Sequence, residues 1–228
     1  MITSKGNMLQ GIFDIFPLAL SVVPWGILCG TISVDIGFTF WQAQAMSMFV
    51  FAGAAQLSAM SLFSAGAGLA SISSSVFAIS SRHILYSVDL RKEVYALPLK
   101  WRISLAYFLT DEVYAVTKSY LYRYHAFSPI YSLTAGVVFY LIWNLATFAG
   151  IVLGQNINDL DKLGLDFAIV AVFIAITAPN LKNKPMLITS LSSAASAIYL
   201  KNIYPDIYIV IASIVGMASG YIASEALK

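Results

Sequence analysis

The stretch "MFVFAGAAQLSAMSLFSAGAGLASISSSVFAISSRH" (48–83) decides the fold class of this 228-residue chain. Residues 36–81 contain no charged residue. The quoted stretch covers the second part of this uncharged run and the two residues that follow it, Arg82 and His83. Over the whole chain 59% of residues are hydrophobic and 11% are charged, and the mean hydropathy is +0.80. Because a water-soluble fold could not bury so much apolar surface, we expect the lipid bilayer to be the solvent of this chain.

The spacing of charges and helix breakers predicts an all-α polytopic membrane protein with about six to eight transmembrane segments in one domain, 1–228. The first apolar run is too long for the core of a signal peptide, so we expect a retained helix. Pro17 and Pro24 predict a kink in that helix. The apolar segments are 11–34, 40–63, 66–90, 102–122, 131–154, 166–179, 185–200 and 206–225.

A weak internal repeat is visible. "GILCG" (26–30) is similar to "GIVLG" (150–154), and "MFVFAGAAQ" (48–56) is followed in the second half by "VFIAITAPN" (172–180). This pattern predicts repeat halves 8–124 and 128–228, although apolar segments also match by chance. With Arg82 set aside as buried, the other twelve Lys and Arg residues divide evenly between the two sides if all eight segments cross. Re-entrant second and sixth segments instead place nine inside and three outside, which favours an inverted repeat with broken helices there.

Four ionisable residues fall within apolar stretches, namely Arg82, His83, Asp111 and Glu112. Each such charge costs about 2.5–3.5 kcal/mol at the bilayer centre, so these residues are expected to face a cavity or one another. A zwitterionic amino acid needs a cation for its carboxylate and an anion for its ammonium group, and Tyr86 shares the helix face of Arg82. His83 or a carboxylate could carry a proton. The alternatives are a structural ion pair, or Arg82 snorkelling at a helix end.

The small residues of "FAGAAQ" (51–56) form a second candidate site. They indicate either close helix packing or a broken helix whose free N–H groups face an anionic group of the substrate. In the second reading Gly53, Ala54 and Gln56 line the gap, and Pro179 marks the equivalent break in the second half. Pro24 marks a further helix break.

Several classes are excluded or disfavoured by the residues. The chain has no G-x-x-x-x-G-K-[ST] loop, no H-E-x-x-H and no G-x-S-x-G, and its two histidines make a metal site unlikely by composition. A net charge of +2 does not favour nucleic acid. We therefore expect a non-enzymatic membrane protein without a cofactor or a bound metal.

The motifs "FAGAAQ" (51–56), "RHILY" (82–86), "LTDEVYAV" (109–116), "GIVLG" (150–154) and "DFAIVAVFIAITAP" (166–179) occur in this order. In this the chain resembles the AzlC family, the large subunit of branched-chain amino acid exporters (the LIV-E family). The resemblance implies an inner-membrane protein of the cell that exports valine, leucine, isoleucine and in some members methionine. It also implies a small hydrophobic AzlD-type partner, and the features of a secondary transporter point to proton coupling.

Carried over by position, the signatures of the family fall on Phe51 to Gln56, on Arg82, His83 and Tyr86, and on Thr110 to Glu112. This chain has Ser80 and Ser81 where relatives often carry an asparagine before the arginine–histidine pair. The alternatives to an exporter of branched-chain amino acids are a membrane scaffold with a purely structural buried ion pair, and a transporter of another small apolar solute.

Overall fold

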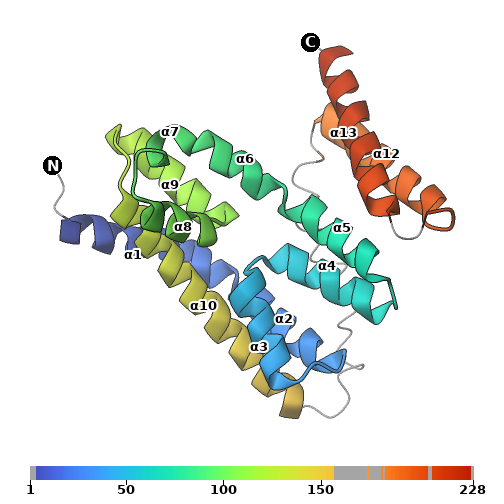
Figure 1. Cartoon of the computed structure of the whole chain (residues 1–228), viewed down its shortest axis with the longest axis horizontal. Coiled ribbons are helices and arrows are strands. Elements are labelled where there is room, and N and C mark those ends of the chain that lie inside the picture. The colour runs from blue at the N-terminus through green and yellow to red at the C-terminus, as the bar shows by residue number, and fades with distance from the viewer. Residues whose placement is uncertain (1–3, 157–173, 175–180, 182, 205–206, 227–228) are drawn as a thin grey trace. The chain divides into compact units, whose positions relative to one another are not determined.

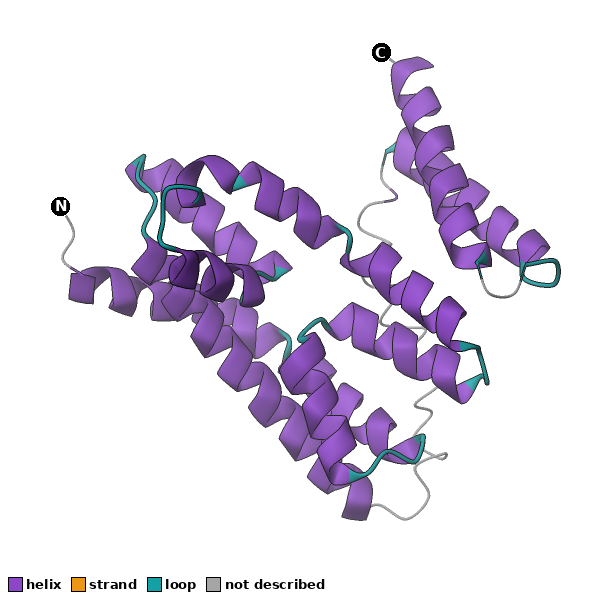
Figure 2. Cartoon of the chain, in the orientation of Figure 1, coloured by secondary structure: helices purple, strands orange, loops and turns teal. Residues whose placement is uncertain are grey.

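The computed structural model describes residues 4–156, 174, 181, 183–204 and 207–226, and all regular secondary structure in these residues is helical (Figure 2). The chain is therefore an all-α protein, as its hydropathy predicts. It divides into two compact units, which are considered separately. The first comprises Met1–Gly53 and Ser81–Ile157, and the second comprises Ala54–Ser80 and Asn158–Lys228.

The described helices follow one another as labelled in Figure 1. The first unit contains α1 (Ser4–Ser21), α2 (Val23–Asp35), α3 (Phe40–Val50), α6 (Arg82–Asp89), α7 (Arg91–Val94), α8 (Leu99–Tyr107), α9 (Asp111–Tyr124) and α10 (Pro129–Asn156). The second contains α5 (Leu69–Ser80), α12 (Lys184–Leu200), α13 (Tyr208–Ala226) and nearly all of α4 (Gly53–Ser64).

None of the first four predicted segments is a single helix. The predicted kink in segment 11–34 and the break considered for segment 40–63 are present, whereas the interruptions of segments 66–90 and 102–122 were not predicted. Segment 11–34 divides at Val22, where α1 and α2 meet at an angle of 51°. Pro24 lies in the first turn of α2, where its missing N–H leaves no helical hydrogen bond unmade. Segment 40–63 divides at Phe51, segment 66–90 at Ser81 and segment 102–122 before Thr110. Hydropathy cannot detect such breaks, because the flanking residues stay apolar.

Two described helices, α10 and α13, are each long and apolar enough to cross a membrane, and the bent pair of α1 and α2 is together a third. Apart from residue 174, segment 166–179 lies outside the described residues, and so does Pro179. The inverted repeat and the re-entrant segments therefore stay predictions. The supposed counterpart of the bent α1–α2 pair, α10, is one continuous helix of 28 residues.

The first unit is built around α10, which packs against α1, α2 and α3 (Figure 1). The two repeated glycine motifs lie against each other at the crossing of α2 and α10. A Cβ atom on Gly30 would overlap the carbonyl oxygen of Thr147, and one on Gly150 would overlap the carbonyl oxygen of Ile27. Thr31 Oγ1 donates to the Gly150 carbonyl oxygen at 3.2 Å across this contact. The glycines thus permit the backbone-to-backbone contact that is common between membrane helices.

The second unit uses the same kind of packing. α12 packs against α13, which also contacts α5. A Cβ atom on Gly216 would lie 2.8 Å from Ser193 Cβ, so small residues again set the distance between helices. Ser58 and Ser75 share a hydrogen bond of 2.7 Å between α4 and α5.

Candidate functional site

The break in segment 40–63 falls at Phe51, the first residue of the "FAGAAQ" motif. Its backbone is left-handed, with φ 43° and ψ 45°, which is a genuine exception for a bulky residue. The side chain is only 6% exposed. Its ring packs against Tyr140 at 5.0 Å and Phe139 at 5.9 Å between ring centroids. Burial of the ring therefore holds a backbone conformation that costs about 1–3 kcal/mol.

A backbone carbonyl group at the C-terminal end of α3 accepts hydrogen bonds from tyrosines of other helices. The carbonyl oxygen of Met48 accepts hydrogen bonds from Tyr107 Oη and from Tyr140 Oη. The last carbonyls of a helix have no partner within the helix, and these two hydroxyls satisfy one of them. The break is therefore a supported feature of the first unit.

The residues predicted after the break begin α4. Gly53 lies against Trp143 of α10, because a Cβ atom there would be 2.7 Å from Trp143 Cη2. Ala54 and Gln56 belong to the second unit, where Ala54 is half-buried and Gln56 is 1% exposed. The structure thus supplies the helix break, and it places Gly53 in the first unit with Arg82 and Asp111.

Arg82 and Asp111 form an ion pair, with 2.8 Å between Arg82 Nη2 and Asp111 Oδ2. Tyr86 Oη donates to the other carboxylate oxygen, Oδ1, also at 2.8 Å. Arg82 begins α6 and Asp111 begins α9, so both charges stand at helix starts that follow a break. The side chains are 35% and 36% exposed. Arg82 Nε is buried and has no acceptor among the described residues.

Local sequence explains why Asp111 stands at a helix start. Thr110 has extended backbone angles, and its hydroxyl accepts a hydrogen bond from the Val113 N–H at 3.4 Å. Such a threonine cap satisfies one of the free N–H groups of the first turn. Asp111 and Glu112 then place two acidic side chains at the positive end of the helix dipole.

His83 and Glu112 flank the pair. The His83 ring is half-buried, with its centroid 6.0 Å from that of Tyr86. Glu112 is half-buried beside the Thr110 hydroxyl, on a different face of α9 from Asp111. Of the predicted residues, the structure therefore brings Arg82, Tyr86 and Asp111 into direct contact and places His83 and Glu112 around them.

Sequence reasoning missed a second ion pair on the same two helices. Lys118 Nζ lies 2.8 Å from Asp89 Oδ2, and Tyr114 Oη donates to that oxygen at 2.8 Å. The rings of Tyr114 and Tyr86 stack between the two pairs, 4.3 Å apart and 12° from parallel. These pairs follow the same chain direction along both helices, so α6 and α9 run parallel. The missed signal was the spacing of Asp111, Tyr114 and Lys118, which puts them on one helix face.

A further polar group, Asp14, was also overlooked within segment 11–34. Tyr131 Oη, on a fully buried side chain of α10, donates to Asp14 Oδ2 at 2.7 Å. Nearby, Tyr120 Oη donates to Asn7 Oδ1 at 3.1 Å, and Asn7 Nδ2 donates to Ser128 Oγ at 3.0 Å. These bonds join α1 to α9 and α10.

Within the described ranges, no cluster of three or more His, Cys, Asp or Glu side chains could hold a metal ion. The Arg82–Asp111 pair instead offers one positive and one negative group within reach of a single small molecule. Chemically, this arrangement can bind a zwitterion or act as a structural ion pair.

Comparison with known proteins decides the family. The model of the family described as "AzlC protein" matches residues 17–157, which is more than half of the chain. The chain belongs to the AzlC family. The AzlC match contains both helix starts that carry the Arg82–Asp111 pair as well as the break at Phe51.

Relatives of this AzlC chain are membrane proteins. An "Uncharacterized membrane protein" of Archaeoglobus fulgidus is 30% identical over 184 residues, 79% of this chain and 80% of that protein. One from Helicobacter pylori strain 26695 is 26% identical and covers 75% of each chain. The "Inner membrane protein YgaZ" of Escherichia coli K12 is 26% identical over 80% of this chain and 77% of its own length. No solved structure matches. The chain is thus a membrane protein of the AzlC family with a transporter-type role.

Proposed function

We propose that this chain is a multi-pass subunit of an inner-membrane exporter for branched-chain amino acids, working by proton-coupled secondary transport with a small AzlD-type partner. The substrates would be valine, leucine and isoleucine, with methionine as a further candidate. In this proposal the chain is not an enzyme and needs no cofactor. Membership of the AzlC family supports the class of protein, and the relative named as an inner-membrane protein supports the location.

The observation that carries the proposal is the ion pair of Arg82 with Asp111. An amino acid carries the same two charges, so it can replace the pair by placing its carboxylate on Arg82 and its ammonium group on Asp111. A guanidinium fork binds a carboxylate through two parallel hydrogen bonds. The buried Nε of Arg82, which has no described acceptor, is a donor that such a carboxylate would satisfy.

The break at Phe51 supports the same reading. Transporters commonly bind substrates where discontinuous helices leave backbone groups unpaired. In this chain Phe51 interrupts one apolar segment, and Arg82 and Asp111 stand just after interruptions in two others. We assign proton carriage to His83 or Glu112, since both titratable groups flank the pair. We also expect an apolar pocket for the substrate side chain, with Phe49 and Phe51 as candidates.

The experiment is efflux of labelled valine, leucine, alanine and lysine from cells that co-express this chain and a small AzlD-type subunit, at two external pH values. We expect pH-dependent efflux of valine and leucine that is lost in Arg82→Ala and in Asp111→Asn. Lys118→Gln is the matched control, because it removes a cation from the other ion pair of the same two helices.

A charge swap separates transport from structure. In Arg82→Asp combined with Asp111→Arg the two charges can still attract, so the level of folded protein should recover while efflux stays lost. Wild-type efflux in the swapped chain, or in either single variant, would show that the pair is structural only. Loss of both efflux and partner binding in Arg82→Ala would favour the scaffold.

A further inference from the structure

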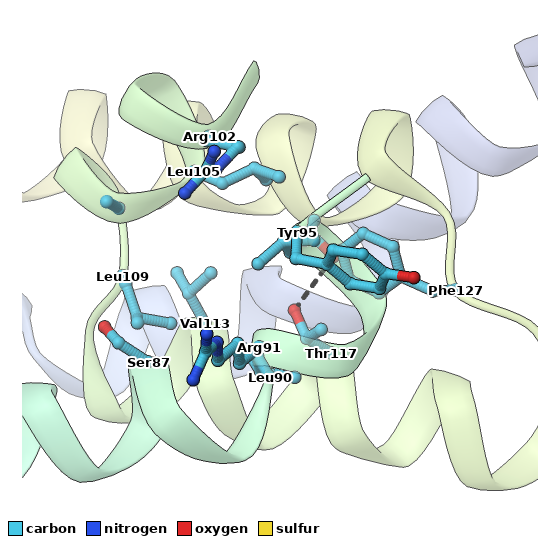
Figure 3. Close-up of a pocket in the computed structure, with 13 residues that line it drawn as sticks. Ser87, Leu90, Arg91, Tyr95, Arg102, Leu105, Leu109, Val113, Thr117 and Phe127 are labelled. Atoms are coloured by element: carbon cyan, nitrogen blue, oxygen red, sulfur yellow. Dashed lines mark hydrogen bonds between the residues drawn. The ribbon is translucent and has the colours of Figure 1, made fainter. Parts of the chain in front are cut away.

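An open cavity of about 500 Å³ lies among α6, α7, α8, α9 and the start of α10 (Figure 3), and neither Arg82 nor Asp111 lines it. Its walls are mainly apolar and include Leu105, Leu109, Val113 and Phe127. On one wall Thr117 Oγ1 donates to Ser132 Oγ at 3.1 Å, so these two hydroxyls already satisfy each other. The cavity therefore offers an apolar interior to a ligand.

The charge on the cavity comes from two arginines. Arg91 begins α7 and Arg102 lies in α8, and Figure 3 shows them on opposite sides of the cavity. The lining contains no acidic residue. Neither guanidinium forms an ion pair with any acidic side chain that the structure describes. Both arginines are exposed. Two cations without an ion-pair partner, from different helices, thus line one mainly apolar space, which suits an anion with an apolar body.

Size and charge argue against an amino acid as the occupant. A water molecule occupies about 30 Å³ in the liquid, so the cavity holds roughly fifteen non-hydrogen atoms or more. Leucine, with about nine, would leave much of it empty on the same scale. The ammonium group of an amino acid would also find two cations and no carboxylate.

The surrounding segment suits the membrane interface. The stretch 91–102 carries four basic residues and one acidic residue. Tyr95 and Leu99 are each 66% exposed and Ile103 is 61% exposed, and Trp101 lies between them in the chain. Tyr and Trp are enriched at the two membrane–water interfaces, and basic pockets between membrane helices bind anionic headgroups.

We propose that this cavity binds an anionic phospholipid, with its phosphate between Arg91 and Arg102 and the first part of its acyl chains against Leu105, Leu109 and Phe127. The lipid would hold α7 and α8 at the interface, because its phosphate would contact a guanidinium group on each of these two short helices. The proposal needs only a membrane protein and is independent of what the chain exports.

The test uses the full-length chain in a neutral detergent. Phosphatidylglycerol or phosphatidylcholine is titrated in, and both the retained lipid, by native mass spectrometry, and the thermal midpoint are measured. We expect phosphatidylglycerol alone to be retained and to raise the midpoint. Arg91→Gln with Arg102→Gln should weaken its binding about tenfold or more, since each basic residue near an anionic lipid contributes a factor of about five.

The matched control is Lys92→Gln with Lys100→Gln, which removes the same charge from the same segment at positions that are equally exposed but do not line the cavity. It should change the affinity less than about threefold, because neither lysine lines the cavity and charges outside it act on its ligand through salt-screened interactions. Leu105→Trp fills the cavity while keeping both arginines, and it should also abolish retention. This variant keeps the proposal testable if the double arginine variant fails to fold.

Three results would overturn the proposal. Equal loss of binding in the lysine and arginine variants would mean diffuse attraction to the surface. Full retention in Leu105→Trp would mean that the lipid binds elsewhere. Competition by glycerol 1-phosphate at concentrations comparable with the lipid would identify a soluble phosphate as the ligand.

Discussion

The crossing of α2 and α10 makes a quantitative prediction. In Gly30→Ala the new Cβ would overlap the Thr147 carbonyl oxygen and lie 2.7 Å from the Ile151 nitrogen. Ordinary contacts need 3.4 Å or more, so the helices must separate by on the order of 1 Å, and such overpacking costs about 1–3 kcal/mol. The Thr31 hydrogen bond to Gly150, at 3.2 Å, would then be lost for about 0.5–1.5 kcal/mol more.

The expected loss is therefore about 2–4 kcal/mol. At roughly 2–4 °C per kcal/mol for a chain of this size, the thermal midpoint in detergent should fall by roughly 5–15 °C. Heating followed by size-exclusion chromatography measures it. Leu145→Phe is the control, because it adds volume to α10 on a side chain that is 67% exposed, and it should leave the midpoint within about 2 °C.

The double variant is the sharper test. Gly150→Ala alone should cost a similar amount, because its Cβ would overlap the Ile27 carbonyl oxygen at the same crossing. Once one methyl group has separated the helices, the second adds little, so Gly30→Ala with Gly150→Ala should cost clearly less than the sum of the single variants. A wild-type midpoint in either single variant, or full additivity, would refute the close crossing.

Three further predictions concern the breaks and the ion pairs. Phe51→Ala should destabilise the chain by about 3–5 kcal/mol through loss of the buried ring. Phe51→Gly should cost about 1 kcal/mol less than Phe51→Ala, because glycine tolerates the left-handed backbone. Equal thermal midpoints of the two variants would contradict the strained break. Thr110→Ala should cost about 1 kcal/mol as the cap of α9 is lost, whereas Thr110→Ser should keep the midpoint. Tyr86→Phe should lower valine efflux more than Tyr114→Phe, because of these two tyrosines only Tyr86 donates a hydrogen bond to Asp111. Each change should lower the thermal midpoint by the equivalent of about 1 kcal/mol. The reverse ranking of efflux would argue against a substrate site at Asp111.

Hydropathy was sufficient to predict the class of fold but not the course of the helices. It located every described apolar segment, because transfer to lipid depends on composition over about twenty residues. It could not locate the interruptions at Phe51, Ser81 and Phe108–Thr110, which depend on single residues. One was readable, since Thr110 followed by two acidic residues is a helix-start signal. The small residues of "FAGAAQ" (51–56) gave a helix break as one of two readings, but they did not place it at Phe51, because the left-handed backbone there depends on rings from distant helices.

The candidate site was partly predictable for a similar reason. Charges of both signs in apolar segments must be compensated, and that physical requirement led us to expect Arg82 to face a cavity or an acidic residue, with Asp111 and Glu112 left as alternatives. The cavity between Arg91 and Arg102 could not be predicted, because those residues appear in the sequence as an ordinary basic loop. The motifs 26–30 and 150–154 were interpreted as traces of a repeat, and the structure gives them a packing role as well.

The two ion pairs of α6 and α9 also fix how these helices can slide against each other. Along α6 the order is Arg82, Tyr86, Asp89, and along α9 it is an acid, a tyrosine and a lysine. If α6 slid along α9 by one helical turn, charged groups would lie opposite aromatic rings and both ion pairs would be lost. A shift of two turns, or an antiparallel arrangement, would set like charges against each other, which is repulsive at close range. Although both helices begin after a helix break, they therefore have one favourable register. Any rearrangement that preserves these contacts must move the two helices together as one rigid body.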